Sequence, residues 1–483
     1  MGRILKNKDT LSERCQRNIF AGPEVHHDLT ITQALELDLL TQIDVVHGQL
    51  AIQGVRNTVV IQNIEIDGTL KLNWCDEVVI GDGVRCTGDV YIKSCNTVVL
   101  PDNWTVPGKL TVEDSGLSVI PRGLHVGGDF SFCKTLIEDY PADTIVGGNV
   151  DGSDSRLYTI AEDLHFYGDL KISRCPIRHL PKRMRIDGNF DISRSRVTEI
   201  GEGVVIGKSL LAAFSMLMRL PDPFVCKGTL DLCACLILEL PQHLEVWDDL
   251  NISNTDIMAL PAKGLVKGGL YASETHIRTI PSGFVFQLFG KFDDSKLEEV
   301  PEQLVLLDYI SFKNCPVQRL GANADKLGAI WANGSALRSL PDNLIVQHCL
   351  NISDCPMDSL PRGLTVLGDL IARGSALKAL PDNLVVDGTL DITQTDVCIV
   401  PATVVYRKLE CSAVCDVLAH WIGENMILHV SGYYLFTGES IWEIMERKDD
   451  AFWCRSLSGK VTTWLIWKDD KWHYGKEFDE LER

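Results

Sequence analysis

The chain repeats itself every 20 residues, and this period constrains its fold more than any other feature. No insertion interrupts the period between residues 41 and 400, which gives 18 repeats. A single unit of this length cannot bury its own apolar face, so the repeats must stack and share one core. The prolines that mark the phase are Pro101, Pro121, Pro141, Pro181, Pro221, Pro241, Pro261, Pro281, Pro301, Pro341, Pro361, Pro381 and Pro401.

Each repeat carries a short strand signal when its positions are numbered from the proline. Positions 10 and 12 are apolar between polar neighbours, as in Leu170 with Ile172, which predicts a strand with one buried face. Position 4 is usually Leu, position 6 usually Val and position 8 commonly Gly. Proline cannot donate to a strand ladder, so position 1 belongs at a bend outside the shared sheet.

From residue 75 onward, position 15 holds only Ser, Thr or Cys. Side chains of this size with one hydroxyl or thiol often bond the backbone at a turn, so we expect an inward-facing ladder just after the strand. Six of the 16 cysteines lie in this column, where a buried thiol is the simplest interpretation. The column is Cys75, Cys95, Ser115, Thr135, Ser155, Cys175, Ser195, Ser215, Cys235, Thr255, Thr275, Ser295, Cys315, Ser335, Cys355, Ser375 and Thr395.

The spacing L-x-I-x-x-[STC]-x-[IL]-x-x-L-P resembles the short leucine-rich repeats of Gram-negative bacteria, in particular those of type III secreted effectors that act inside host cells. The resemblance covers about residues 41–400 and departs at position 15, where that family has Asn, and at positions 4 to 8. It implies a leucine-rich-repeat horseshoe with a parallel β-sheet on its concave face. The departures leave a straighter β-solenoid, with a second strand at positions 4–6, as the alternative.

The ends of the chain leave the period. Residues 1–40 are expected to form an N-terminal cap with a strand-like piece at 29–31, and a secretion signal in about the first 20 residues is the alternative. Residues 401–483 contain six of the ten tryptophans, which predicts a C-terminal cap or a small α+β module. We expect helices over 412–430 and 439–448, and a hairpin around the turn from Lys468 to Lys471.

Composition limits the classes of partner and compartment. The net charge of −20 argues against non-specific binding to nucleic acid or anionic membrane, and no apolar run is long enough for a membrane span. The cysteines form no CxxC pair, which favours reduced thiols in a reducing compartment. With the resemblance, this implies the bacterial cytoplasm before secretion and the host cell cytoplasm afterwards; oligomeric state is left open.

Large aromatic side chains in four successive repeats mark the strongest candidate binding site. Tyr271, Phe289, Tyr309 and Trp331 occupy outward-facing positions 9 or 11. Exposed aromatics on a strand face are typical of protein-binding hot spots, and an inward or edge-covering patch is the alternative. The predicted site also includes Lys291 and Asp293. Leu211 with Phe214 is a weaker candidate.

An acidic run in the first half of the array is a further candidate surface. It would steer a basic partner, unless it is simply a solvated face. The residues of the run are Asp129, Asp151, Asp169, Asp191, Asp231 and Asp249.

No catalytic motif accompanies the repeats. The chain has no P-loop, no GxGxxG after a strand, no HExxH and no zinc-spaced cluster, so we expect no catalytic residues, metal ligands or cofactor. Effectors of this family that are ubiquitin ligases carry a Cys-x-Asp motif, whereas Cys415 and Asp416 are adjacent. The leading hypothesis is a non-enzymatic, effector-like scaffold that binds a host or cellular protein on its concave face and has a role in virulence. The alternatives are an effector enzyme whose C-terminal module modifies the captured partner, and a structural solenoid outside the cell.

Overall fold

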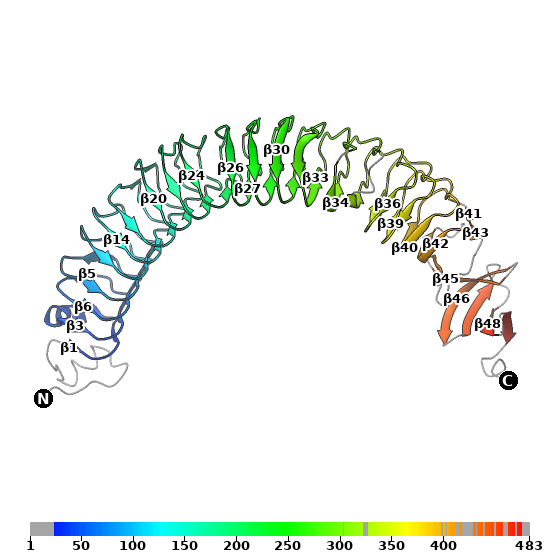
Figure 1. Cartoon of the computed structure of the whole chain (residues 1–483). Helices are drawn as coiled ribbons and strands as arrows, with labels where there is room; N and C mark the ends of the chain where they lie inside the picture. Colours follow the sequence, from blue (N-terminus) through cyan, green and yellow to red (C-terminus); the bar gives the residue numbers. More distant parts are fainter. Residues whose placement is uncertain are drawn as a thin grey trace. The chain divides into compact units, whose positions relative to one another are not determined.

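We analysed a computed structural model of the chain (Figure 1). It describes residues 24–475 except 303, 322–326, 398, 402, 412–415, 418–427, 431, 438–439, 449–450, 457–461 and 469–470, so the predicted secretion signal lies outside the described residues. The chain divides into two compact units, Met1–Asp256 and Ile257–Arg483.

The first unit is a solenoid of stacked coils whose strands pair in parallel. Each coil contributes one strand, beginning near position 10, to a shared sheet that we call the long row. From Leu50 onward the paired residues are 20 apart, so the sequence period is the pairing register, whereas Leu29 pairs with Leu50. The strands of this row are β2 (Leu29–Ile31), β4 (Leu50–Gln53), β7 (Leu70–Asn73), β10 (Val90–Lys93), β13 (Leu110–Glu113), β15 (Phe130–Ser131), β18 (Val150–Asp151), β21 (Leu170–Lys171), β23 (Phe190–Asp191), β25 (Leu210–Leu211), β27 (Leu230–Asp231) and β29 (Leu250–Asn251).

A second set of short parallel strands lies at positions 4–6 of the same coils. The structure therefore combines the expected leucine-rich-repeat sheet with the second strand of the solenoid alternative. These strands are β1 (Glu24–Val25), β3 (Val45–Val46), β6 (Glu65–Ile66), β9 (Arg85–Cys86), β12 (Thr105–Val106), β14 (His125–Val126), β17 (Ile145–Val146), β20 (His165–Phe166), β22 (Arg185–Ile186), β24 (Val205–Ile206), β26 (Phe224–Cys226) and β28 (Leu244–Val246).

A third side of some coils also forms strands. They are β5 (Thr58–Ile61), β8 (Glu77–Ile80), β11 (Thr97–Val99), β16 (Asp139–Tyr140) and β19 (Thr159–Ile160). The strand predicted at 29–31 is confirmed as β2, and the 3-10 helix η1 (Ala34–Gln42) follows it. Among the described residues, no helix has the length and apolar character needed to cross a membrane.

The second unit repeats this plan and then changes it. Its long row consists of β31 (Leu270–Tyr271), β33 (Phe289–Lys291), β34 (Leu306–Ser311), β35 (Leu327–Trp331), β37 (Leu350–Asn351), β39 (Leu370–Ile371), β40 (Val385–Ile392), β42 (Val405–Cys411) and β44 (Leu428–Val430). Its other parallel strands are β30 (Lys263–Val266), β32 (Gly283–Phe286), β36 (Ile345–Val346), β38 (Thr365–Val366), β41 (Ile399–Val400) and β43 (Asp416–Val417). The register slips as expected near residue 401, because Leu390 pairs with Leu409 rather than with a residue 20 positions away.

The last described strands are antiparallel, and here the predicted helices are wrong. Residues 440–448, expected to be helical, form a strand, and the described parts of 412–430 are strands β43 and β44. The Glu, Met and Lys residues of 440–448 favour a helix, but pairing with a strand on each side overrides that preference. The hairpin is confirmed by pairing of Lys468 with Lys471. These strands are β45 (Gly432–Thr437), β46 (Ser440–Lys448), β47 (Ala451–Ser456), β48 (Thr462–Lys468) and β49 (Lys471–Gly475).

The Ser/Thr/Cys column forms the inward ladder that the sequence predicts. Every member is buried except Thr395, which is half-buried. The threonine hydroxyls donate to the position 12 carbonyl of their own coil, as from Thr135 Oγ1 to Phe132 O at 2.7 Å. The thiols point to that carbonyl in the preceding coil instead, as from Cys175 Sγ to Gly152 O at 3.1 Å, and Ser155 Oγ lies 3.5 Å from the same sulfur. The column thus satisfies backbone groups at the turn that follows each strand.

Candidate functional site

The predicted aromatic residues lie on the outward face of the long row in the second unit. Tyr271, Phe289, Tyr309 and Trp331 are all half-buried, whereas the residue that follows each of them in the chain, such as Ala272 or Ile310, is buried in the core. This alternation is the expected consequence of strand geometry. The rings therefore stand on the sheet surface and are partly covered by their neighbours.

Three of these rings contact one another, and we call them the aromatic row: Tyr271, Phe289 and Tyr309. The Phe289 and Tyr309 rings are stacked, with centroids 5.0 Å apart and planes within 6°. The Tyr271 ring meets Phe289 edge-on, at a centroid distance of 4.9 Å and an interplanar angle of 74°. Both arrangements are favourable for aromatic pairs. Phe289 is central because its backbone pairs directly with Tyr309 in register.

A glycine in the preceding coil makes room for the central ring. A Cβ atom on Gly269 would lie only 2.1 Å from Phe289 Cζ, so the ring occupies the space that a side chain at 269 would fill. The Phe289 ring therefore packs against Gly269 and contacts the Tyr271 ring and the Tyr309 ring.

Trp331, the fourth predicted aromatic, makes a different contact. The Nζ atom of Lys313 lies 5.5 Å from the centroid of its ring, within the range of a cation–π interaction. The structure thus joins three of the four aromatics into one stack and places the fourth against a lysine.

The two charged residues predicted beside the rings have different roles. Lys291 Nζ lies 3.9 Å from Asp293 Oδ2, and the lysine side chain is partly exposed. Asp293 is buried, and its Oδ1 accepts hydrogen bonds from Ser311 Oγ and from the backbone N–H of Lys313. Asp293 therefore ties one coil to the next, whereas the side chains of Lys291 and Lys313 are partly exposed.

The acidic run in the first unit is largely engaged with the protein's own backbone. At position 9, Asp129 Oδ1 accepts the N–H of Asn149 at 2.9 Å, and Asp169 Oδ1 accepts the N–H of Asn189 at 2.7 Å. Lys109 also donates to Asp129 and, as the largest cause, holds the pKa of that carboxyl below its usual range. The carboxylates of Asp151, Asp191 and Asp231 each accept the backbone N–H two residues later. Capping the coils explains this run without a basic partner.

An exposed apolar patch in the first unit was missed by reasoning from strand positions. Phe214, Met216, Met218, Leu236 and Leu238 have exposed fractions between 47% and 57% and lie on two successive coils. They follow the strand, at positions 14, 16 and 18, and most repeats have polar residues at positions 14 and 18. Comparing those columns would have revealed the patch, which includes Phe214 of the weaker predicted candidate. Contiguous apolar surface of this kind marks interaction sites.

Known proteins offer limited comparison. No protein-family model matches the chain, and the search of curated proteins finds no match. Among solved structures, YopM from Yersinia enterocolitica WA-314 is similar over 79% of this chain and 85% of that chain, with 18% identity and a TM-score of 0.49. The structure of YopM, a leucine-rich effector protein from Yersinia pestis, matches with 16% identity over 62% of this chain and 75% of that chain, at a TM-score of 0.34.

A leucine-rich-repeat protein of Leptospira interrogans is also similar, with 12% identity over 71% of this chain and 86% of that chain and a TM-score of 0.35. The proteins named in these comparisons are thus leucine-rich-repeat proteins.

Proposed function

We propose that this protein is a non-enzymatic scaffold that binds another protein through the aromatic row. The observation that carries the proposal is the ring stack itself: Tyr271, Phe289 and Tyr309 are half-exposed on a sheet face and fixed by mutual contact. Aromatic side chains supply much contact area and lose little conformational freedom when they bind. Rings that already pack against one another lose even less conformational entropy on binding, because their side chains are ordered before the partner arrives.

The charges around the row indicate the chemistry of the partner. Lys291 and Lys313 are partly exposed near it, while the nearby carboxylate of Asp293 is buried and hydrogen-bonded. A complementary partner segment would carry an apolar or aromatic anchor flanked by acidic residues. Such a segment lies along the sheet face with its anchor against Phe289.

The test replaces the rings and compares them with a surface of similar apolar character. Partner proteins are captured on the full-length chain, identified by mass spectrometry, and titrated against the wild type and the Phe289→Ala/Tyr309→Ala variant. Hot-spot truncations cost about 2 kcal/mol or more each, so we expect a loss of affinity of at least about 30-fold. Circular dichroism confirms that the variant is folded.

The matched control is Leu236→Ala/Leu238→Ala, which trims the apolar patch of the first unit. This control should bind the partner as the wild type does. Loss of binding in the control with retention in the ring variant would contradict the proposal and assign the interaction to the apolar patch instead.

We further propose that the protein acts as an effector of the type III secreted class, on a partner in the host cytoplasm. The support is the sequence resemblance of the 20-residue repeat, together with buried thiols of the Ser/Thr/Cys column, such as Cys175, Cys235 and Cys315, that form no disulfide. Fusing residues 1–40 to a translocation reporter in a secretion-competent bacterium tests it. Equal reporter delivery in secretion-deficient cells, or none in competent cells, would argue against the proposal.

A further inference from the structure

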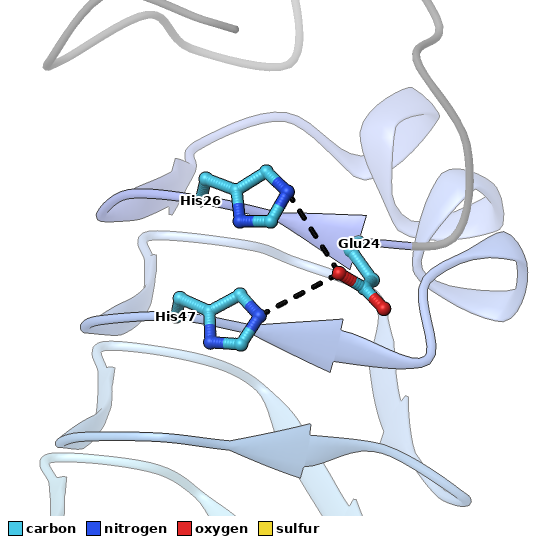
Figure 2. Close-up of side chains that lie close together, drawn as sticks. All are labelled: Glu24, His26 and His47. Carbon is cyan, nitrogen blue, oxygen red and sulfur yellow. Dashed lines mark ion pairs between the residues drawn. The ribbon is translucent and has the colours of Figure 1, made fainter. Parts of the chain in front are cut away.

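Two histidines and a glutamate meet on the outer face of the first coils of the first unit (Figure 2). Glu24 begins β1, and His26 follows that strand directly, while His47 follows β3. In the parallel pairing, Glu24 lies opposite Val45 and Val25 opposite Val46, so the next pair in register is His26 and His47. The two valines that pair are turned toward the core, and Glu24, His26 and His47 are exposed on the opposite side.

The side chains converge on one point. The two imidazole rings are stacked, with centroids 5.0 Å apart and planes within 2°. The Nε2 atom of His26 and the Nε2 atom of His47 each lie 3.7 Å from Glu24 Oε2, as the dashed lines of Figure 2 show. One ligand atom from each residue lies within 4.8 Å of the other two.

A second carboxylate lies close enough to interact electrostatically with one of the rings. On the far side of His47, its Nδ1 atom lies 3.7 Å from Asp67 Oδ2 in the following coil. A proton on Nδ1 directed at this carboxylate leaves the lone pair of Nε2 facing Glu24. Metal-binding histidines commonly use their second nitrogen in this way, with a carboxylate fixing the tautomer and ring orientation.

We propose that Glu24, His26 and His47 form a binding site for a divalent transition-metal ion, with Zn²⁺ as the probe. Two imidazole nitrogens and one carboxylate oxygen are a common three-ligand set for zinc, with the fourth position open to water. Ligand bonds of about 2.0–2.2 Å put neighbouring ligand atoms roughly 3.3–3.5 Å apart in a tetrahedral site. Side chains this exposed can close the remaining distance by small rotations about their χ angles. Imidazole ligands disfavour Mg²⁺ and Ca²⁺, which prefer oxygen.

The site would act as a clamp between coils. Its ligands come from β1 and β3, so a bound ion joins the first two coils that the structure describes on a face where their strands are only two residues long. No short sequence motif marks it, because His26 and His47 are 21 residues apart and become neighbours only through coil stacking.

The test is a calorimetric titration of the metal-free full-length chain with ZnCl₂ in a non-chelating buffer. The same titration of the His26→Ala/His47→Ala variant gives the zinc bound by all other groups in the chain. The zinc bound at the proposed site is the difference in stoichiometry between the wild type and this variant. We expect one more equivalent of zinc per wild-type chain, and an apparent affinity at least tenfold lower in Glu24→Gln and His47→Ala. Asp67→Asn, which alters only the orienting carboxylate, should weaken binding less than removal of a ligand.

A matched control is His165→Ala, because His165 is also exposed and pairs with a carboxylate, Asp187, at 2.8 Å. It should bind zinc as the wild type does. A second readout is the thermal unfolding midpoint, which zinc should raise in the wild type and in the control but not in the double histidine variant. Equal zinc stoichiometry in the wild type and the double variant, or absence of the additional equivalent at millimolar zinc, would overturn the proposal.

Discussion

A large and a small side chain compensate for each other in the core of the first unit, and this offers a sharp test of how the coils pack. Phe132 and Gly152 occupy position 12 in successive coils, and Phe132 is fully buried. A Cβ atom on Gly152 would lie 2.3 Å from both Cε2 and Cζ of the Phe132 ring. Gly152 is outside the left-handed region, so alanine there meets a packing conflict without backbone strain.

The expected magnitude follows from two opposing terms. Forcing a methyl group against a buried ring costs about 1–3 kcal/mol of unfolding free energy. Restricting the unfolded chain by the Gly→Ala change returns about 0.4–1 kcal/mol. The difference spans about 0–2.6 kcal/mol, and because an approach of 2.3 Å is a severe overlap, Gly152→Ala should destabilise the protein by about 2 kcal/mol. Phe132→Leu alone should also destabilise it, by about 1–2 kcal/mol, because a void replaces the outer part of the ring.

The double variant distinguishes this explanation from a general intolerance of substitution. With Leu at 132, the methyl group at 152 enters the space that the ring has left. The loss in the double variant should be smaller than the sum of the single losses by about 1 kcal/mol or more. Equilibrium urea unfolding of the full-length chain, followed by circular dichroism, measures the four free energies of the cycle. Additive losses, or a neutral Gly152→Ala, would refute the reasoning.

Three further predictions concern two side chains that hydrogen-bond the backbone and one buried thiol. Thr135→Val should lower the unfolding free energy by about 1–3 kcal/mol, because the carbonyl of Phe132 loses its 2.7 Å hydroxyl donor, whereas Thr135→Ser keeps that donor and should cost less in the same urea assay. Asp169→Asn should leave the thermal unfolding midpoint nearly unchanged, whereas Asp169→Ala should lower it. The reason is that the side chain accepts the N–H of Asn189, which an amide oxygen can do as well as a carboxylate. Burial raises the pKa of Cys86 from 9.0 to about 12, so at pH 9 iodoacetamide should modify this thiol in the unfolded but not the native chain, as judged by peptide mass spectrometry. For the same reason, stability should fall as pH rises from about 9 to about 12, because the unfolded chain loses the Cys86 proton first.

The sequence period was enough to predict the strands and the inward column. A strict 20-residue spacing leaves stacking as the only way to bury positions 10 and 12, and stacking brings Thr135 and Ser155 into one line. The second strand at positions 4–6 was visible as an alternative, because Leu and Val recur there.

Other features depended on contacts that a single-repeat pattern does not contain. Asp293 accepts a hydrogen bond from Ser311 of the next coil, and a single repeat does not contain this contact. Residues 440–448 were predicted as helix from local preference, and pairing with neighbouring strands decided otherwise. The meeting of His26 with His47 depends on an offset of 21 residues at the start of the array, outside the regular period.

The constant register has a consequence for how such a chain can change in length. Within the first unit, each coil from Leu50 onward is paired to the next with the same 20-residue offset, and its side chains occupy the same columns. Recombination between neighbouring repeats therefore adds or removes one whole coil and leaves every remaining pair intact. Deletion of a single residue would instead put the positions that follow it out of register with the same positions in the preceding coil. Viable variants of this array should differ by multiples of the repeat, so its reach can evolve in discrete steps of one strand spacing, about 4.8 Å.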